Sequence, residues 1–147
     1  ASKDNEAETL PLIRLLLAQR CAVLVPVVLP GRRLGWSRLL APGELRRGKW
    51  GILEPGPAWR RFMTPPGNAV CLTPGTAFTP EGRRIGYGGG YYDRFFRSWT
   101  GRRVGLAFDI QVIPDIPAGR YDCPLDLTIT ETRLLLPPRG FSPPHRR

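Results

Sequence analysis

The 147-residue sequence contains a single histidine, His145, which lies in a tail rich in proline and arginine. Histidine is the most common general acid or base in enzymes and a frequent metal ligand. Its scarcity argues against base catalysis by histidine and against a histidine metal site. Any chemistry must therefore rely on carboxylates, Lys or Arg side chains, hydroxyl groups, backbone amides or a bound ion.

Cysteine is also scarce, with only Cys21, Cys71 and Cys123 in the chain. Their number is odd and their spacing matches no metal-binding motif, so a cysteine metal site is not expected. Cys21 and Cys71 lie in or beside apolar runs typical of strands, and we expect both to be buried reduced thiols. Reduced thiols are typical of a cytoplasmic protein, and this is the location that we predict.

Long apolar runs are missing as well. No stretch approaches the roughly 20 apolar residues that span a bilayer, and the N-terminal ASKDNEAETL is too acidic and polar for a signal peptide. Hydrophobic residues make up 41% of the chain and charged residues 23%, a balance typical of a globular protein. We expect no membrane association, a single α/β domain over residues 1–136, and a disordered Pro/Arg-rich tail over residues 137–147.

Acidic residues are outnumbered by basic ones. The 22 Lys and Arg residues against 12 Asp and Glu give a net charge of +10, most of it from arginine. This balance favours anionic partners, such as nucleic acid, nucleotides or a polycarboxylate ligand, but it is also typical of an arginine-rich surface with no specific partner. Because no RNA-binding motif is present and the basic residues are scattered along the chain, nucleic acid is not the partner that we expect.

Short apolar runs rich in β-branched residues predict buried strands. They cover residues 22–28, 69–73, 103–108 and 126–130, and RLLLPP could add an edge strand. Before them, NEAETLPLIRLLLAQR has leucines at helical spacing, with acids at its start and arginine at its end, as a helix dipole favours. APGEL indicates a short helix and GILEP an extended turn. This alternation predicts an α/β fold, a three-layer Rossmann-like domain with a largely parallel sheet.

The segment RRIGYGGGYYDRFF, Arg83 to Phe96, places four glycines before two tyrosines and an aspartate. Glycines let backbone N–H groups converge on an anion without interference from Cβ atoms. The aromatic spacing predicts a helix starting near Tyr91, with Asp93 in its first turn, where it could hold a magnesium ion that bridges phosphate oxygens. Arg84 would add a cation. The alternative is a glycine-rich hairpin with a capping aspartate; neither the Walker A loop nor the dinucleotide fingerprint fits the segment.

Four segments resemble a known family. PGTAFTPEGRRIGYGGGYYDRFF closely resembles the signature of the 5-formyltetrahydrofolate cyclo-ligases, also called methenyltetrahydrofolate synthetases. NEAETLPLI resembles the Glu-x-x-Thr helix of that family, GILEP its Gly-Ile-x-Glu-Pro element, and VGLAFDIQVIPDIPAGRYDCPLDLTITE its C-terminal run. The segments follow the order of the family and cover roughly residues 5–131.

The resemblance implies an enzyme that uses Mg-ATP to convert 5-formyltetrahydrofolate into 5,10-methenyltetrahydrofolate, with release of ADP and phosphate. In the mechanism that such enzymes are thought to use, the formyl oxygen attacks the γ-phosphate, a ring-closing nitrogen attacks the activated formyl carbon, and phosphate leaves. This chemistry needs positioning and charge neutralisation of phosphate, and no histidine base. The implied partners are a reduced folate and Mg-ATP, and we expect a monomer.

The resemblance also implies site residues, position by position. ATP would contact Arg84, Ile85, Gly86, Tyr87, Gly88, Gly89, Gly90, Tyr91 and Tyr92. The folate would contact Glu6, which can accept two hydrogen bonds from a 2-amino-4-oxo ring edge, and also Tyr87, Gly88, Gly89, Gly90 and Tyr91. Magnesium would bind Asp93 and Asp122, and the catalytic residues would be Arg84, Tyr91 and Asp93. Trp50 and Phe78 could stack on the folate or lie in the core.

Two features depart from the family pattern. The chain begins almost at the Glu-x-x-Thr segment, so we expect that an N-terminal segment, with a Lys/Arg pair for the ATP phosphates, is missing. Thr79 stands where the family has an aspartate that helps to order its loop. A catalytically weak relative that binds folate or nucleotide is therefore one alternative to the enzyme. A basic RNA-binding module is a second.

Overall fold

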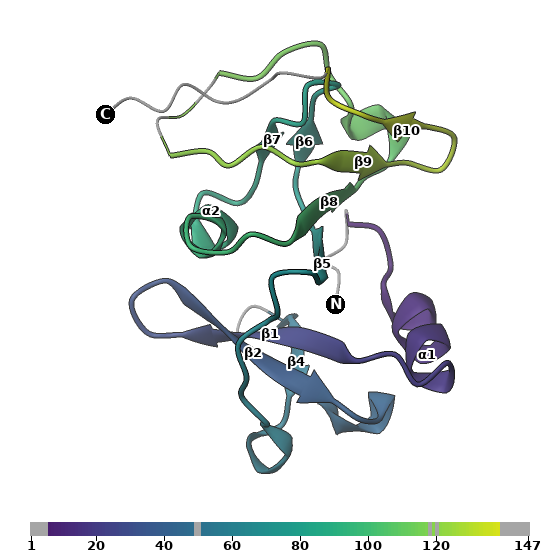
Figure 1. Ribbon diagram of the computed structural model, residues 1–147, viewed down its shortest axis with the longest axis vertical. Coiled ribbons are helices and arrows are strands. Elements are labelled where there is room, and N and C mark those ends of the chain that lie inside the picture. The colour runs from purple at the N-terminus through teal and green to yellow at the C-terminus, as the bar shows by residue number, and fades with distance from the viewer. Residues whose placement is uncertain (1–5, 49–50, 118, 120, 139–147) are drawn as a thin grey trace. The chain divides into compact units, whose positions relative to one another are not determined.

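A computed structural model of the chain describes residues 6–48, 51–117, 119 and 121–138 (Figure 1). The chain divides into two units, Ala1–Pro66 and Gly67–Arg147. The first contains α1 and β1 to β4, and the second contains α2 and β5 to β10. The single domain over residues 1–136 stays a prediction. Trp50, His145 and the predicted tail beyond Pro138 lie outside the described residues.

An antiparallel hairpin forms the centre of the first unit. β1 (Val23–Leu29) pairs with β2 (Arg33–Leu39) along its whole length. Val23, Val25 and Val27 are buried in alternation, as in a strand with one buried face. The strand predicted over residues 22–28 is confirmed, but its neighbour is antiparallel and does not belong to the parallel sheet. The sequence analysis gives no strand at β2, because RLGWSRL contains glycine and two arginines without a regular alternation.

α1 (Leu10–Ala18) packs against this hairpin. Its Ile13 is buried with Val23, Val25 and Leu39, so the helix is stabilised mainly by its apolar face. Pro11 lies in the first turn, where the missing N–H costs no hydrogen bond. The expected charge pattern is wrong: because the helix begins at Leu10, its first turn contains no acid and its last turn no basic residue.

A second, shorter hairpin follows in the first unit. The 3₁₀ turn η1 (Pro42–Glu44) leads into β3 (Leu45–Arg47), which pairs with β4 (Leu53–Pro55) ahead of η3 (Pro57–Trp59). The helix predicted at APGEL is therefore a 3₁₀ turn, and the extended turn predicted at GILEP is a strand. Buried Glu54 of β4 accepts a 3.2 Å hydrogen bond from the Val28 N–H and so ties this hairpin to β1.

Glu44 carries a largely buried charge at the start of this hairpin. Its carboxylate accepts hydrogen bonds from the Arg61 guanidinium at 2.9 and 3.0 Å, and from the Leu40 N–H at 3.2 Å. The hydrogen bonds from Arg61 lower the pKa of Glu44 below its ordinary value of 4.5, and they outweigh desolvation, which raises it. The carboxylate thus stabilises the first unit in its ionised form.

The second unit contains a mixed four-stranded sheet with the order β10-β9-β8-β5. β5 (Val70–Thr73), β8 (Arg102–Leu106) and β9 (Leu127–Ile129) run parallel, and β10 (Leu134–Leu135) pairs antiparallel with β9 at the edge (Figure 1). The strands predicted near residues 69–73, 103–108 and 126–130, and the edge strand, are confirmed. The fold is therefore α/β with a mixed sheet.

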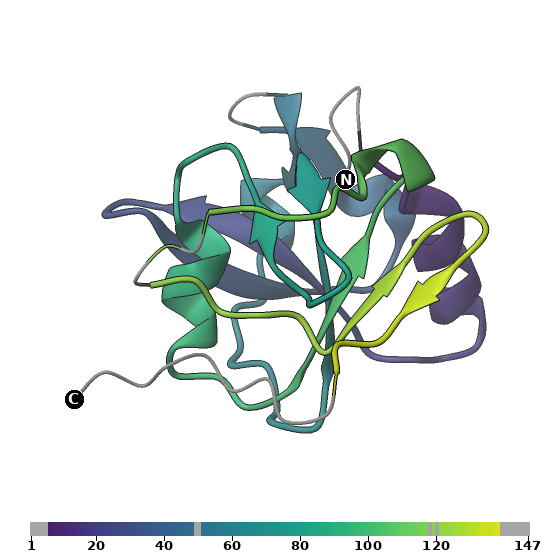
Figure 2. The ribbon, with the colours of Figure 1, turned by 90° about the horizontal axis from the view of Figure 1, so that it is seen from above.

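The connection from β5 to β8 carries the glycine segment. β6 (Ala77–Phe78) pairs with β7 (Arg84–Ile85), and α2 (Tyr91–Phe96) follows the glycines (Figure 2). The helix predicted near Tyr91 is confirmed. The three-layer Rossmann-like arrangement is not confirmed, because α2 is the only α-helix among the described residues of this unit. Of the described helices, including η4 (Asp109–Gln111) after β8, none has the length and hydropathy needed to cross a membrane.

Phe78 lies at the centre of the second unit. Its side chain is fully buried and packs with Ala107 and Leu125. A Cβ on Gly105 of β8 would lie 2.7 Å from Leu125 Cδ1 and 2.9 Å from Phe78 Cε1, so this close packing requires glycine. Of the two alternatives that the sequence left open for Phe78, packing in the core is therefore the one observed.

The thiols differ in burial. Cys71 of β5 is buried as predicted, but the expectation for Cys21 is wrong, because this residue lies in the turn between α1 and β1 and is exposed. Burial raises the pKa of Cys71 to about 11, and it also raises the pKa of the half-buried Cys123. Both thiols are protonated at neutral pH, so neither suits a nucleophile.

The Glu44–Arg61 pair predicts an acid-sensitive contribution to stability. Because the folded-state pKa of Glu44 is depressed, this contribution is fully present above the unfolded value near 4.5 and is lost as pH falls through the folded value. Glu44→Gln should lower the melting temperature at pH 7, and the gap to the parent should narrow as the pH falls below 4.5. Thermal unfolding across this range measures it. Exposed Glu8→Gln is the control, and a gap independent of pH would contradict the assignment.

Candidate functional site

The loop Gly86–Gly90 joins β7 directly to α2, so the hairpin alternative for this segment is not what the structure contains. Gly88 and Gly90 have φ values of +77° and +64°, a left-handed backbone that residues with a Cβ rarely adopt. A Cβ on either glycine would meet no described atom within 4 Å apart from its chain neighbours. The backbone therefore faces open space, as a cradle for an anion requires. Since α2 has only six residues, this backbone, and not a helix dipole, is what suits phosphate.

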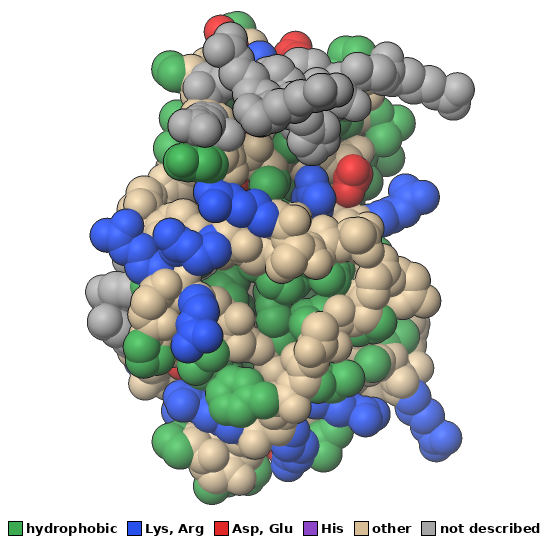
Figure 3. All heavy atoms as spheres, turned by 60° about the vertical axis from the view of Figure 1, so that its left-hand side comes forward, with side chains coloured by type: hydrophobic (Ala, Val, Ile, Leu, Met, Phe, Trp, Pro, Cys, Tyr) green, Lys and Arg blue, Asp and Glu red, His purple; other side chains and the backbone are tan. Residues whose placement is uncertain are grey.

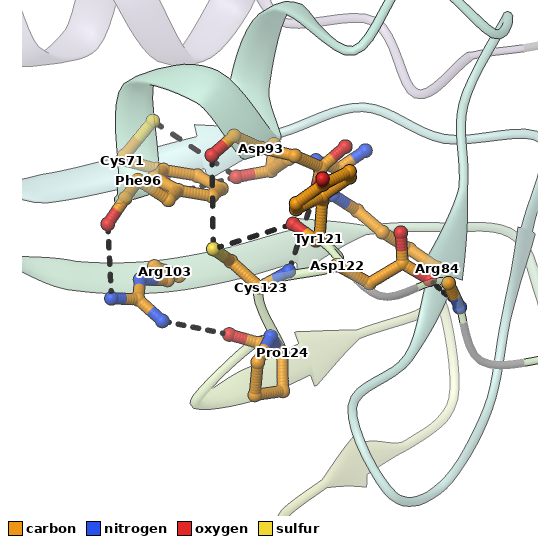
Figure 4. A network of polar contacts seen from close by, with 11 residues as sticks. Cys71, Arg84, Asp93, Phe96, Arg103, Tyr121, Asp122, Cys123 and Pro124 are labelled. Carbon is orange, nitrogen blue, oxygen red and sulfur yellow. Dashed lines mark hydrogen bonds and ion pairs between the residues drawn. The ribbon is translucent and has the colours of Figure 1, made fainter. Parts of the chain in front are cut away.

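Arg84 and Asp93, at the two ends of this segment, form an ion pair (Figure 4). Arg84 Nη2 lies 2.9 Å from Asp93 Oδ1. Only 5% of the Arg84 side chain and 22% of the Asp93 side chain are exposed, so the pair is largely removed from water. Two predicted catalytic residues thus contact each other, and the pair fixes the position of α2 relative to β7.

The rest of the Arg84 side chain is held by aromatic rings. Its Cζ lies 5.6 Å from the ring centroid of Tyr92 and 5.9 Å from that of Phe96, within the range of cation–π attraction. Its Nε is buried and has no hydrogen-bond partner among the described residues. An unpaired donor next to the glycine loop is a position at which a further acceptor, such as a phosphate oxygen, would lower the free energy.

Asp122 approaches Asp93 from a distant part of the sequence. Asp122 is exposed, and its Oδ2 accepts a 2.7 Å hydrogen bond from the Gly119 N–H. The next residue, Cys123, donates its N–H to Asp93 Oδ1 at 3.4 Å and its thiol to the Asp93 carbonyl oxygen at 3.7 Å. The chain next to one predicted magnesium ligand therefore contacts the other ligand directly (Figure 4).

The donor set fits magnesium with a bound nucleotide. Magnesium usually binds proteins through one or two carboxylates and takes its other ligands from phosphate and water. Asp93 and Asp122 supply two such carboxylates, and among the described residues both hydrogen bonds to the Asp93 carboxylate end on Oδ1, which leaves Oδ2 for a metal. No group of three or more Asp, Glu, His or Cys side chains forms a metal site in the described part of the chain. A metal held without phosphate would thus have few protein ligands.

The other predicted residues differ in their positions. Tyr87 and Ile85 are exposed beside the loop, whereas Tyr91 and Tyr92 are half-buried on α2. Tyr92 packs its ring 5.9 Å from that of Phe96, so it supports the Arg84 side chain. Glu6 lies ahead of α1 in the first unit, whereas the glycine loop lies in the second unit.

Thr79 stands where the sequence resemblance leads us to expect an aspartate, and its hydrogen bonds order the turn that it occupies. Its hydroxyl accepts the Arg83 N–H at 3.3 Å, and its own N–H donates to the Arg83 carbonyl oxygen at 2.9 Å. Thr79 is fully buried in the turn between β6 and β7. The departure at this position therefore leaves the turn ahead of the glycine loop closed.

Arg103 and Cys123 are the residues near the site that the sequence analysis did not select. Arg103 begins a predicted strand, where a basic residue is ordinary, and Cys123 lies in the C-terminal run of the family pattern, where only Asp122 was given a role in the site. Their contacts join segments far apart in the chain, so no local pattern could have indicated them.

A mixed α/β sheet, a glycine loop with left-handed backbone and an adjoining Arg–Asp pair are features of phosphate-binding α/β proteins, the class that this fold and site indicate. Known proteins narrow this class, because residues 1–131 match the profile of the 5-formyltetrahydrofolate cyclo-ligase family. The chain belongs to this family. The resemblance drawn from the sequence is confirmed.

Individual relatives agree with this assignment. The chain is 33% identical to the 5-formyltetrahydrofolate cyclo-ligase of Haemophilus influenzae over 84% of this chain and 69% of that protein. It is 32% identical to the enzyme of the same name from Escherichia coli K12, over 90% of this chain and 76% of that protein. The solved structure of Aquifex aeolicus 5,10-methenyltetrahydrofolate synthetase, at 31% identity, matches with a TM-score of 0.80 and covers 100% of this chain and 74% of that one.

The buried Arg84–Asp93 pair should show strong energetic coupling. Asp93→Asn leaves a nearly buried guanidinium without its partner and should lower the free energy of unfolding by about 2 kcal/mol. Arg84→Met should cost a similar amount, and the double variant less than the sum, with a coupling energy of about 1 kcal/mol or more. Urea unfolding of the four proteins measures this cycle.

The pair of Arg83 with Asp115, whose carboxylate side chain is 79% exposed, provides the matched control. Its N–O distance is also 2.9 Å, but exposure to water should limit its coupling energy to less than about 0.5 kcal/mol. Additive effects at Arg84 and Asp93 would show that their contact does not stabilise the unit.

Proposed function

We propose that this protein converts 5-formyltetrahydrofolate into 5,10-methenyltetrahydrofolate in a reaction that consumes ATP, requires magnesium and releases ADP and phosphate. The observation that carries the proposal is the family match over residues 1–131, which includes the glycine loop with its left-handed backbone. Both substrates are anions. On the face shown in Figure 3, Lys and Arg side chains far exceed acidic ones, as the net charge of +10 requires, and such a surface favours anionic ligands.

The ATP phosphates are proposed to lie against the glycine loop. Backbone N–H groups of Gly86, Gly88, Gly89 and Gly90 donate to phosphate oxygens, because these four residues have no Cβ to block their approach. Arg84, whose Nη2 is held by Asp93, adds its positive charge beside the loop, and its Nε–H is an unused donor. Ile85, Tyr87, Tyr91 and Tyr92 line the nucleotide on both sides of the loop. Charge neutralisation of this kind lowers the barrier to phosphoryl transfer.

Asp93 and Asp122 are proposed to hold the magnesium ion. These two carboxylates would hold the ion, and its positive charge would offset the negative charge on the transferred phosphoryl group. The Asp93 carboxylate would offer Oδ2 to the ion, since the hydrogen bonds from Arg84 and Cys123 end on Oδ1. Arg84, Tyr91 and Asp93 then surround the γ-phosphate, where the formyl oxygen attacks.

The folate is proposed to bind through Glu6 and the loop. The carboxylate of Glu6 accepts two hydrogen bonds from the 2-amino-4-oxo edge of the pterin ring. Tyr87, Gly88, Gly89, Gly90 and Tyr91 border the formyl group. A cytoplasmic monomer with a three-layer arrangement remains the prediction for the whole protein.

The test is the growth of methenyl absorbance when protein, Mg-ATP and 5-formyltetrahydrofolate are mixed. Growth should require both ATP and magnesium and should stop on chelation with EDTA. Folate binding without growth would indicate an inactive relative. Binding of RNA that weakens steeply with salt, without folate binding, would indicate a nucleic-acid module and overturn the proposal.

Gly88→Ala should raise the KM for ATP by about tenfold or more, because alanine disfavours a φ of +77° and its methyl group enters the space proposed for phosphate. Stability should fall by only about 1 kcal/mol, since the Cβ meets no described atom but those of its chain neighbours. Initial rates over a range of ATP concentrations measure the effect.

Gly31→Ala is the matched control for this variant. Gly31 has a similar φ of +72°, but it lies in the β1–β2 turn. It should show the same loss of stability with an unaltered KM for ATP. An equal KM for ATP in the two variants would show that the glycine loop is not part of the nucleotide site.

A further inference from the structure

Arg103 of β8 holds two segments that are distant in sequence. Its Nη2 donates to the carbonyl oxygen of Phe96 at 3.5 Å, and its Nη1 donates to that of Pro124 at 3.3 Å (Figure 4). Nη2 also donates to the carbonyl oxygen of Trp99 at 3.4 Å. Its Cζ also lies 5.3 Å from the ring centroid of Phe96. One planar guanidinium therefore contacts the end of α2 and the segment that follows Asp122.

These contacts supply hydrogen-bond donors at the C-terminal end of the short helix α2. The last carbonyl groups of any helix lack partners within it, and a cation at this end is favourable. Among the described residues, the Arg103 guanidinium donates to the Phe96 carbonyl at the end of α2 and to the Trp99 carbonyl beyond it, and it forms no ion pair with a carboxylate. These carbonyl oxygens therefore hold the Arg103 guanidinium in place, and the guanidinium in turn holds the carbonyl groups.

Each of the two segments carries one proposed magnesium ligand. Asp93 lies one helical turn before Phe96, and Asp122 lies two residues before Pro124. Cys123 also connects the segments, through a long 3.4 Å hydrogen bond to Asp93 Oδ1 and a thiol contact to its carbonyl oxygen, and the Arg97 guanidinium lies 4.4 Å from the ring centroid of Tyr121. Hydrogen bonds of this length are weak one by one, so the spacing of the two carboxylates depends on several contacts together, those of Arg103 included.

We propose that Arg103 is a positioning residue that sets the spacing of Asp93 and Asp122 for magnesium. The inference rests on the proposed function, because it assumes that these carboxylates hold the metal. Arg103 touches neither metal nor substrate. It acts through the main chain of α2 and of the segment after Asp122, and residues that support ligands in this way often change metal affinity strongly.

The test compares Arg103→Met with Arg102→Met. Methionine keeps much of the length and apolar contact of Arg103 but removes every donor, whereas Arg102 is the exposed neighbour in the same strand and loses the same charge. Magnesium affinity is measured by calorimetry with a non-hydrolysable ATP analogue present, so the reading does not depend on turnover. The magnesium dependence of the rate and the KM for 5-formyltetrahydrofolate are measured in parallel.

For Arg103→Met, the dissociation constant for magnesium should rise roughly tenfold or more, with a smaller change in the KM for the folate. Arg102→Met should match the parent. Arg103→Lys, which keeps the charge but cannot reach three carbonyls with one planar group, should lie between the two. Lys is also the variant to use if the Met variant does not fold.

Unchanged magnesium affinity in folded Arg103 variants, with or without a lower melting temperature, would show a purely structural role and overturn the inference. An equal loss of affinity in Arg102→Met would overturn it as well, by tracing the effect to charge alone. A parent protein that neither turns over nor binds magnesium would instead refute the proposed function. The two failures are thus distinguishable.

Discussion

A guanidinium that is almost removed from water must find a charge partner, and the second unit depends on the partner that Arg84 finds in Asp93. The ion pair joins the end of β7 to the first turn of α2 and spans the glycine loop between them. The loop can therefore adopt a backbone with few steric limits while both of its ends stay in place. Tyr92 and Phe96 pack around the same guanidinium, so these two aromatic residues of α2 also stabilise the charge of Arg84.

A second constraint acts where the chain returns to α2 after β8. Parallel strands require crossovers, and such connections bring residues far apart in sequence to one end of a sheet. Asp93 comes from the crossover between β5 and β8, and Asp122 from the segment that leads into β9. Arg103 on β8 lies between them in sequence and contacts both segments, which explains how a single strand residue can affect the geometry of a pair of carboxylates.

Much of the architecture of the second unit was predictable, because apolar β-branched runs and helical aromatic spacing are local signals. These signals located β5, β8, β9 and α2. The first unit was less accessible. β2 contains two arginines and a glycine, yet it pairs with β1 along the whole length of that strand. The register of such a hairpin depends on the partner strand. Cys21 was misplaced for a related reason, since one residue at a boundary decides between burial and exposure.

The sequence by itself determined the family, the identity of the glycine loop and the two aspartates, because these depend on residue types in a fixed order. Tertiary structure decided what each of them contacts. Arg84 pairs with Asp93 and is nearly buried, Phe78 belongs to the core, Thr79 closes a turn, and Arg103 joins segments that no motif connects. The physical reason is that burial and pairing of charge are properties of the packed chain. They depend on the whole environment of a side chain, and a local sequence pattern does not contain it.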